Sequence, residues 1–248
     1  MFDDIKETIW QHVVAEATKQ SPMEACGLII RSGKGGQRAI TCKNEALREG
    51  SDPRKTFRIT REEMEQAEDQ GEILACYHSH IYQPPIPSAG DKTFSEQSRI
   101  PFLIVGWPTK QWELYTPNGW RAELVGRPYF YGILDCYTLI RDYYKEKLNI
   151  ELADFDRADR WWADGRDFYM ENYWKVGFVQ VQDAPRLHDV ILMQMWPSKV
   201  ANHAAIYLGD GHILHHLTGR PSVITTYLVN DGEYAKATRG IFRHKTLC

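Results

Sequence analysis

The chain has 248 residues, of which 43% are hydrophobic and 25% are charged, and its formal net charge at pH 7 is -3. A chain of this length forms one large or two smaller domains and buries a sizeable core. Its near-neutral charge gives no electrostatic reason to expect a nucleic acid or an anionic membrane as a partner, so its function has to be inferred from individual sites.

The N-terminal residues 1–7 are charged and lack the apolar core of a signal peptide. No stretch reaches the roughly 18 apolar residues that a membrane span requires. The 5 cysteines are an odd number and include no Cys-x-x-Cys pair, which argues against a disulfide framework. We therefore expect a protein that stays in the cytoplasm where it is made, with no membrane span.

The first third of the chain predicts a helix followed by a hairpin. Apolar residues at every fourth position indicate an amphipathic helix over residues 2–19. Residues 26–31 and 39–42 are strand-like, and the glycine-rich connection at 32–36 suits a hairpin. Further elements follow in the order strand, helix, strand, strand and strand, at residues 57–59, 60–70, 101–106, 112–116 and 121–124.

Two histidines and an aspartate in this half have the pattern of a catalytic zinc site. Residues 73–77 are apolar and predict a buried strand, beyond which His78 and His80 point to the same face, because side chains alternate along a strand. Ser88 is the predicted N-cap of a helix, and Asp91 in its first turn returns a carboxylate towards the strand end. Three protein ligands leave the fourth tetrahedral position of zinc open for water.

Glu24, just ahead of the first predicted strand, is the candidate base that takes a proton from this water. A glutamate followed by His-Ser-His, seven residues and Ser-x-x-Asp resembles the signature of the JAMM, or MPN, zinc metallopeptidases. The resemblance covers roughly the first half of the chain. It implies an α/β sandwich in which His78, His80 and Asp91 bind zinc. It also implies that Ser88 stabilises the oxyanion while an amide or isopeptide bond is hydrolysed.

The pattern restarts after residue 120, and residues 125–128 look like a short linker. We therefore expect two domains, at residues 1–124 and 125–248. Helical spacing of apolar residues after Asp135 places Cys136 in the first turn of a helix. Unpaired backbone N–H groups and the helix dipole favour a thiolate there, so Cys136 is the candidate nucleophile of the second domain.

The general base for this thiol is predicted from a hairpin over residues 203–216, whose Gly-Asp-Gly turn joins two strand-like runs. Such a hairpin can bring His203 and His215 alongside each other, one to take the thiol proton and the other to orient the base. The sequence does not fix the register of the strands. His216 therefore competes with His215 for the orienting role.

These residues resemble the NlpC-type papain-like cysteine peptidases, many of which cut bacterial cell-wall peptides. In that family an Asp-Cys opens a helix, and a hairpin with the pattern His-x-x-Ile-Tyr-Leu-Gly-x-Gly-x-x-x-His completes the site, which His203 and His215 match. The strand at residues 189–192 also matches the family, although His188 stands before it where the family has a glycine. Tyr137-Thr138 replaces the Ser-Gly that usually follows the cysteine. The resemblance implies an α+β domain and thiol hydrolysis of a cell-wall peptide or a protein, with an altered substrate preference.

Together the halves predict an α/β (α+β) chain and resemble the tail tip assembly proteins of lambda-like bacteriophages over nearly the whole length. The resemblance implies partners among other phage tail tip proteins and a location in the host cytoplasm during assembly or in the virion tail tip. The leading hypothesis is a hydrolase with two peptidase sites. The alternative is a tail assembly scaffold that retains peptidase folds without catalysis. A third hypothesis, release of sulfur or small groups from carrier proteins, ranks lowest.

Overall fold

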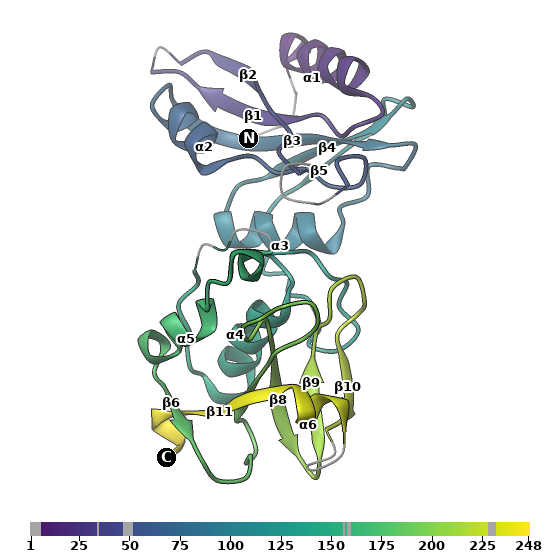
Figure 1. The fold of residues 1–248 in the computed structure, drawn as a ribbon. Helices are drawn as coiled ribbons and strands as arrows, with labels where there is room; N and C mark the ends of the chain where they lie inside the picture. The colour runs from purple at the N-terminus through teal and green to yellow at the C-terminus, as the bar shows by residue number, and fades with distance from the viewer. Residues whose placement is uncertain (1–5, 34, 47–51, 156, 158–159, 228–231) are drawn as a thin grey trace. The chain divides into compact units, whose positions relative to one another are not determined.

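The structure is a computed structural model that describes residues 6–33, 35–46, 52–155, 157, 160–227 and 232–248. Its backbone contacts divide the chain into two compact units, Met1–Arg121 and Ala122–Cys248. Figure 1 labels the helices and strands of both units. Within the described residues, no helix is long and apolar enough to cross a membrane.

The first unit contains one mixed sheet between helices. Its elements in chain order are α1 Glu7–Gln20, β1 Cys26–Arg31, β2 Gln37–Cys42, α2 Arg61–Glu68, β3 Glu72–Ile81, α3 Ala89–Ser98, β4 Phe102–Trp107 and β5 Trp112–Tyr115. The strand order is β2-β1-β3-β4-β5, and β3 and β4 are parallel while the other neighbours are antiparallel. β3, the central strand, is therefore protected by neighbours on both edges, and its end is where the two histidines lie.

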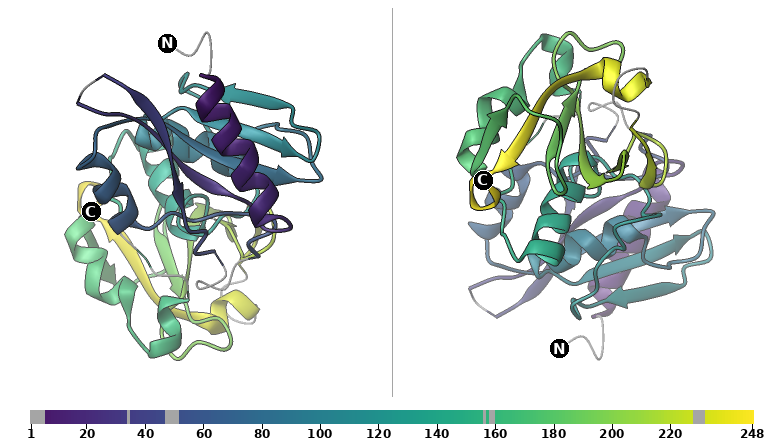
Figure 2. Two further views of the ribbon diagram at one scale, coloured as in Figure 1. Left: turned by 90° about the horizontal axis from the view of Figure 1, so that it is seen from above. Right: turned by 90° about the horizontal axis from the view of Figure 1, so that it is seen from below.

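Apolar side chains cover both faces of this sheet. Ile9 and Val13 of α1 pack against one face, and Figure 2 shows this helix lying across the strands. The opposite face forms a second cluster with Ala67 of α2, and Phe94 of α3 contacts Phe102 of β4. The predicted α/β sandwich is present. The predicted helix over residues 2–19 begins at Glu7 among the described residues, and residues 1–5 lie outside them.

The strand expected at residues 57–59 is not formed, although the rings and methyl groups there pack on the sheet. The reason is that Asn44 takes the hydrogen bonds that a neighbouring strand would make. Its Oδ1 accepts from the backbone N–H of Arg58 at 3.2 Å and of Ala46 at 3.0 Å. Its Nδ2 donates to the carbonyls of Glu24, Pro53 and Thr56. One amide therefore fastens this loop to the segment that contains Glu24.

The second unit is built on a six-stranded antiparallel sheet. Its elements are α4 Cys136–Leu148, η1 Trp161–Asp164, α5 Phe168–Asn172, η2 Tyr173–Val176, β6 Phe178–Val181, β7 Val190–Met193, β8 His203–Gly209, β9 His212–His215, β10 Val223–Thr226, α6 Glu233–Ala237, β11 Thr238–His244 and η3 Lys245–Leu247. The strand order is β10-β9-β8-β7-β11-β6. The predicted hairpin is formed by β8 and β9, which lie between β10 and β7 in this sheet.

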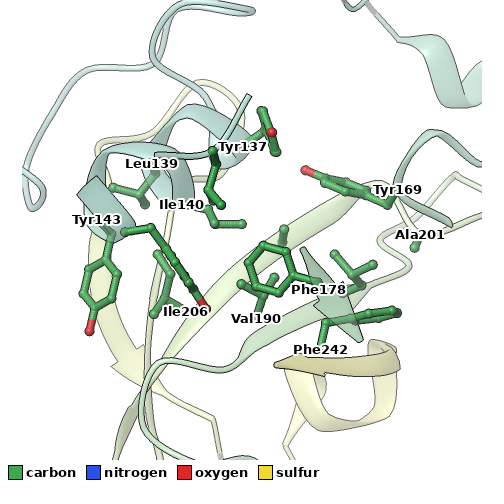
Figure 3. Close-up of a cluster of buried hydrophobic side chains, with 14 of the residues drawn as sticks. Tyr137, Leu139, Ile140, Tyr143, Tyr169, Phe178, Val190, Ala201, Ile206 and Phe242 are labelled. Atoms are coloured by element: carbon green, nitrogen blue, oxygen red, sulfur yellow. The ribbon is translucent and has the colours of Figure 1, made fainter. Parts of the chain in front are cut away.

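The α4 helix packs on one face of this sheet through an aromatic core. Figure 3 shows Tyr137 and Ile140 of α4 facing Val190 and Phe242 of the strands, with Tyr169 of α5 beside them. The opposite face packs on α6 through a smaller cluster. Burial of these apolar side chains stabilises the packing of α4, and with it the position of Cys136, on the strands.

The strand expected at residues 121–124 is also not formed. Ser222 instead forms hydrogen bonds with backbone groups of residues 124–127. Its Oγ donates to Leu124 O at 2.9 Å and accepts from Arg127 N at 3.1 Å, and its backbone bonds to Gly126 and Arg127. Leu124 packs in the core of the second unit. The start of this unit is therefore hydrogen-bonded to Ser222, which lies 98 positions after Leu124 in the sequence.

Candidate active sites

His78, His80 and Asp91 converge at the end of β3 and the start of α3. The Nε2 atoms of the two histidines are 3.1 Å apart, and they lie 3.3 and 3.6 Å from the Asp91 carboxylate oxygens. Nitrogen and oxygen ligands bound to zinc at about 2.0–2.1 Å in a tetrahedron lie roughly 3.3 Å from one another. Among the described residues, this is the one group of side chains arranged to bind a metal ion. The residues therefore fit a zinc ion.

The ligands are oriented by the surrounding structure. His80 Nδ1 lies 3.0 Å from the carbonyl of Pro84, so this nitrogen is the donor and Nε2 is left to bind a metal. The ring of His78 stacks on Phe57, with centroids 4.5 Å apart. Although burial opposes it, charge and hydrogen bonds from His78 and His80 lower the pKa of Asp91. The third ligand is thus held in its anionic form.

Ser88 and Asp91 form a capping box at the start of α3. Asp91 N donates to Ser88 Oγ at 3.1 Å, and Ser88 N donates to Asp91 Oδ2 at 2.8 Å. The box explains why the chain turns back at this point, because it satisfies two backbone donors of the first helical turn. The Ser88 side chain also hydrogen-bonds to the Asp91 carboxylate, which lowers the pKa of Asp91.

Glu24 is buried, with an exposed fraction of 5%, and its charge is coupled to those of His80 and Asp91. Its backbone is held by Asn44 and by the residue between the two histidines, since Ala25 N donates to Ser79 Oγ at 2.9 Å. Burial raises the pKa of Glu24 to about 8, and His80 partly offsets this. A divalent cation nearby would lower this pKa, because it favours the carboxylate.

Cys136 is the first residue of α4 and is partly buried. Its Sγ lies 3.2 Å from the hydroxyl of Tyr169, and it also accepts a hydrogen bond from the backbone N–H of Ala204, which lowers its pKa. Ala204 directly follows His203, so the thiol lies beside the start of β8. On the same strands, His203 Nε2 is 3.1 Å from His215 Nδ1. The structure thus brings His203 and His215 together.

His216 lies near Asp135, the N-cap residue of α4, and is not the residue that contacts His203 Nε2. It is fully buried, and its ring meets that of Tyr129 edge to face, with centroids 5.1 Å apart. Successive residues of a strand point to opposite sides, which explains why His215 faces His203 and His216 does not. The geometry therefore favours His215 over His216 as the partner of His203.

The expectation of a stable thiolate at the helix N-terminus is not met. Burial raises the pKa of Cys136 to about 11, and the Asp135 carboxylate raises it further, while Tyr169 and Arg157 act in the opposite direction. Burial lowers the pKa of His203 to about 3 and of His215 to about 4. The free site near neutral pH therefore contains a neutral thiol and neutral imidazoles. Burial and the capping carboxylate outweigh the helix dipole.

Three residues near these sites escaped the sequence-based predictions: Asn44, Arg157 and Tyr169. Each contacts a residue far away in the sequence; Cys136 and Tyr169, for example, are 33 positions apart. One signal could have found Arg157. A buried aspartate at an N-cap requires a cation, and arginine is the usual partner.

Models of two families match successive parts of the chain. The model of prokaryotic homologs of the JAB domain matches residues 6–121, and that of the NlpC/P60 family matches residues 126–243. These matches agree with the two sheets described above and confirm the predicted order, a JAMM-like half before an NlpC-type half.

Two relatives match the chain over most of its length, and a third matches a smaller part of it. Tail tip assembly protein K of Escherichia phage N15 is 30% identical over 94% of this chain and 93% of its own length. Tail tip assembly protein K of Escherichia phage lambda is 37% identical over 73% of this chain and 86% of its own length. A protein named desampylase from Haloferax volcanii is 27% identical over 41% of this chain and 75% of its own length.

Proposed function

The chain belongs to the family of tail tip assembly protein K, and from this premise we propose that it acts in phage tail tip assembly as a hydrolase with two peptidase sites. Its proposed partners are other tail tip proteins, and its proposed location is the host cytoplasm during assembly or the tail tip itself. The observation that supports the first site best is the convergence of three ligand side chains, two of which, His80 and Asp91, interact electrostatically with the buried Glu24.

In the first domain, a zinc ion bound by His78, His80 and Asp91 would act as a Lewis acid for the scissile carbonyl and for water. Glu24 takes a proton from the attacking water and returns it to the leaving amine. Its buried position near His80 and Asp91 suits this exchange, since burial raises the pKa of Glu24 and a bound cation would lower it again towards the range of a base that works near neutral pH. Ser88 donates its hydroxyl hydrogen to the oxygen that becomes negative.

The test is a comparison of Glu24→Gln with His80→Ala in the full chain. We expect Glu24→Gln to retain about one zinc per chain, measured by elemental analysis, and to lose cleavage of co-expressed tail tip proteins, measured by mass spectrometry. His80→Ala should lose the metal, because it removes one of three ligands. Equal zinc loss in the two variants would contradict the roles given to these residues.

In the second domain, His203 takes the Cys136 proton as the sulfur attacks the scissile carbonyl carbon, and it gives that proton to the departing amine. Water then hydrolyses the thioester. His215 orients His203 through the contact between their ring nitrogens. Because thiol and imidazole are neutral at rest, proton transfer accompanies the attack. The proposed substrate is a cell-wall peptide or a tail protein.

A scaffold whose second domain is inactive is the competing function, and one observation favours it. The Cys136 thiol contacts Tyr169 and has a raised pKa, as an unreactive structural cysteine would. Incubation of the full chain and of Cys136→Ala with purified peptidoglycan separates the two functions. The peptidase proposal expects peptide release by the unmodified chain alone, whereas the scaffold proposal expects none from either.

A further inference from the structure

Asp135, the residue before the proposed nucleophile Cys136, has its carboxylate buried against a guanidinium. Asp135 Oδ2 accepts from Arg157 Nη2 and from Gly132 N, each at 3.0 Å, and Oδ1 accepts from Thr138 N at 2.9 Å. The side chains of Asp135 and Arg157 are each only 4% exposed. Asp135 is therefore both the N-cap of α4 and one half of a buried ion pair.

The Asp135 carboxylate that caps α4 makes the Cys136 thiol harder to deprotonate. A negative charge beside Cys136 disfavours the negative charge that the sulfur must develop, and Asp135 indeed raises the thiol pKa, second only to burial. Arg157 lowers that pKa. In a buried site these effects are screened less than at the surface. The cation thus offsets a charge that the fold of α4 requires.

Arg157 is itself held in place by several contacts. Its Nη1 donates to Asp154 Oδ1 at 2.8 Å and to the carbonyl of Phe155 at 2.9 Å. Its guanidinium carbon lies 4.9 Å from the centroid of the Tyr137 ring. Asp154 also pairs with Arg141 of α4. These contacts fix the guanidinium at the N-terminus of the helix, where it faces Asp135.

We infer that Arg157 is a positioning residue for the thiol reaction, which acts through Asp135: it holds the N-terminus of α4 in place and offsets the charge of its cap. This inference rests on the proposed function of the second domain. The charged and titratable groups that interact with Cys136 are Asp135, Arg157, Tyr169 and Tyr129, and His216 interacts with Asp135. Of these, Arg157 is the cation.

The test is the pH dependence of the rate at which iodoacetamide alkylates Cys136 in the full chain, followed by mass spectrometry of the peptide. Arg157→Met removes the charge and should move the midpoint up by about one pH unit, a tenfold slower rate at a fixed pH below it. Arg157→Lys keeps the charge and should stay near the unmodified chain. Arg186→Met is the matched control, because Arg186 forms an exposed pair with Asp183 and does not contact Asp135 or Arg157, and it should leave the profile unchanged.

A double variant separates charge compensation from mere structural support. Asp135→Asn with Arg157→Met keeps a side chain able to cap the helix and removes both charges. It should return the profile to that of the unmodified chain. An unchanged profile in Arg157→Met, or equal slowing in the single and double variants, would overturn the inference. If Arg157→Met does not fold, Asp135→Asn alone makes the comparison: it removes the anion beside Cys136 and keeps Arg157, so it should move the midpoint down, and an unchanged midpoint would overturn the inference. Alkylation needs no peptidase activity, so this result is independent of substrate cleavage.

Discussion

His216 shows what a buried histidine does to the pH dependence of stability. Its side chain is fully buried, and burial lowers its pKa from 6.5 to about 4. The folded state therefore binds a proton less readily than the unfolded state. Its contribution to stability is fully present above pH 6.5 and is lost as the pH falls towards 4. His203 and His215 have lowered pKa values for the same reason, so acid should destabilise the second domain.

We predict that His216→Phe makes the second domain less sensitive to acid. Between pH 7 and pH 5, the free energy of unfolding should fall by on the order of 1–2 kcal/mol less in this variant than in the unmodified chain. Denaturant unfolding at the two pH values measures the difference. His212→Phe, at the exposed first position of β9, the strand that ends just before His216, is the control and should retain the original dependence. Identical acid sensitivity in both variants would show that His216 does not titrate between these pH values.

Site residues could be predicted from the sequence when their partners are close in the sequence, and not when their partners are distant in it. His78, His80 and Asp91 could be predicted because a short motif contains them and local structure turns them to one point. Asn44 and Arg157 could not, since their partners are brought to them by the tertiary fold. The helix dipole alone does not predict the pKa of Cys136, because burial and Asp135 both raise it.

At the scale of elements, three helices of the chain begin with the same device. Capping boxes at Thr60–Glu63, Ser88–Asp91 and Asp135–Thr138 open α2, α3 and α4. Two of these boxes contain or adjoin proposed catalytic residues. The third has no such role, which makes it a natural comparison for the other two.

We predict that Thr60→Ala and Ser88→Ala each lower the free energy of unfolding of the first domain by about 1 kcal/mol, the usual effect of losing an N-cap. Only Ser88→Ala should lower hydrolysis at the first site, because only Ser88 adjoins the metal ligand Asp91. Denaturant unfolding and the cleavage assay give the two quantities. Equal activity loss in both variants would reduce Ser88 to a helix cap.

Elements could be predicted where periodicity or a turn motif was strong, as in α1, β3 and the β8–β9 hairpin. The two strands predicted at residues 57–59 and 121–124 failed for one physical reason. In both places side chains take backbone hydrogen bonds that a neighbouring strand would otherwise make: Asn44 at the first, and Arg127 with Ser222 at the second. A single sequence shows that such segments are apolar, but it does not show which partner bonds to their backbone.

At the scale of the whole molecule, the two proposed sites share no residue. The first is formed by residues within the unit Met1–Arg121, and the second by residues within Ala122–Cys248. Both fold classes could be predicted because each half contains its own complete motif and its own hydrophobic pattern. Sites with no shared partners usually respond to substitution independently.

We therefore predict that Cys136→Ala leaves zinc content and first-site hydrolysis unchanged, within the error of elemental analysis and the cleavage assay. In the converse experiment, removal of the metal by a chelator should leave the alkylation rate of Cys136 unchanged. A change of twofold or more in either measurement, with both domains still folded, would show that the sites are coupled.

The hydrogen bonds of Ser222 decide where this chain can be cut into fragments. Leu124, Gly126 and Arg127 bond to Ser222 through their backbones, and Leu124 also contributes to the core of the second unit. A truncation that starts at residue 128 would leave Ser222 without these partners and open the core at its edge. A recombinant second domain should therefore start no later than Ala122, the first residue of that unit.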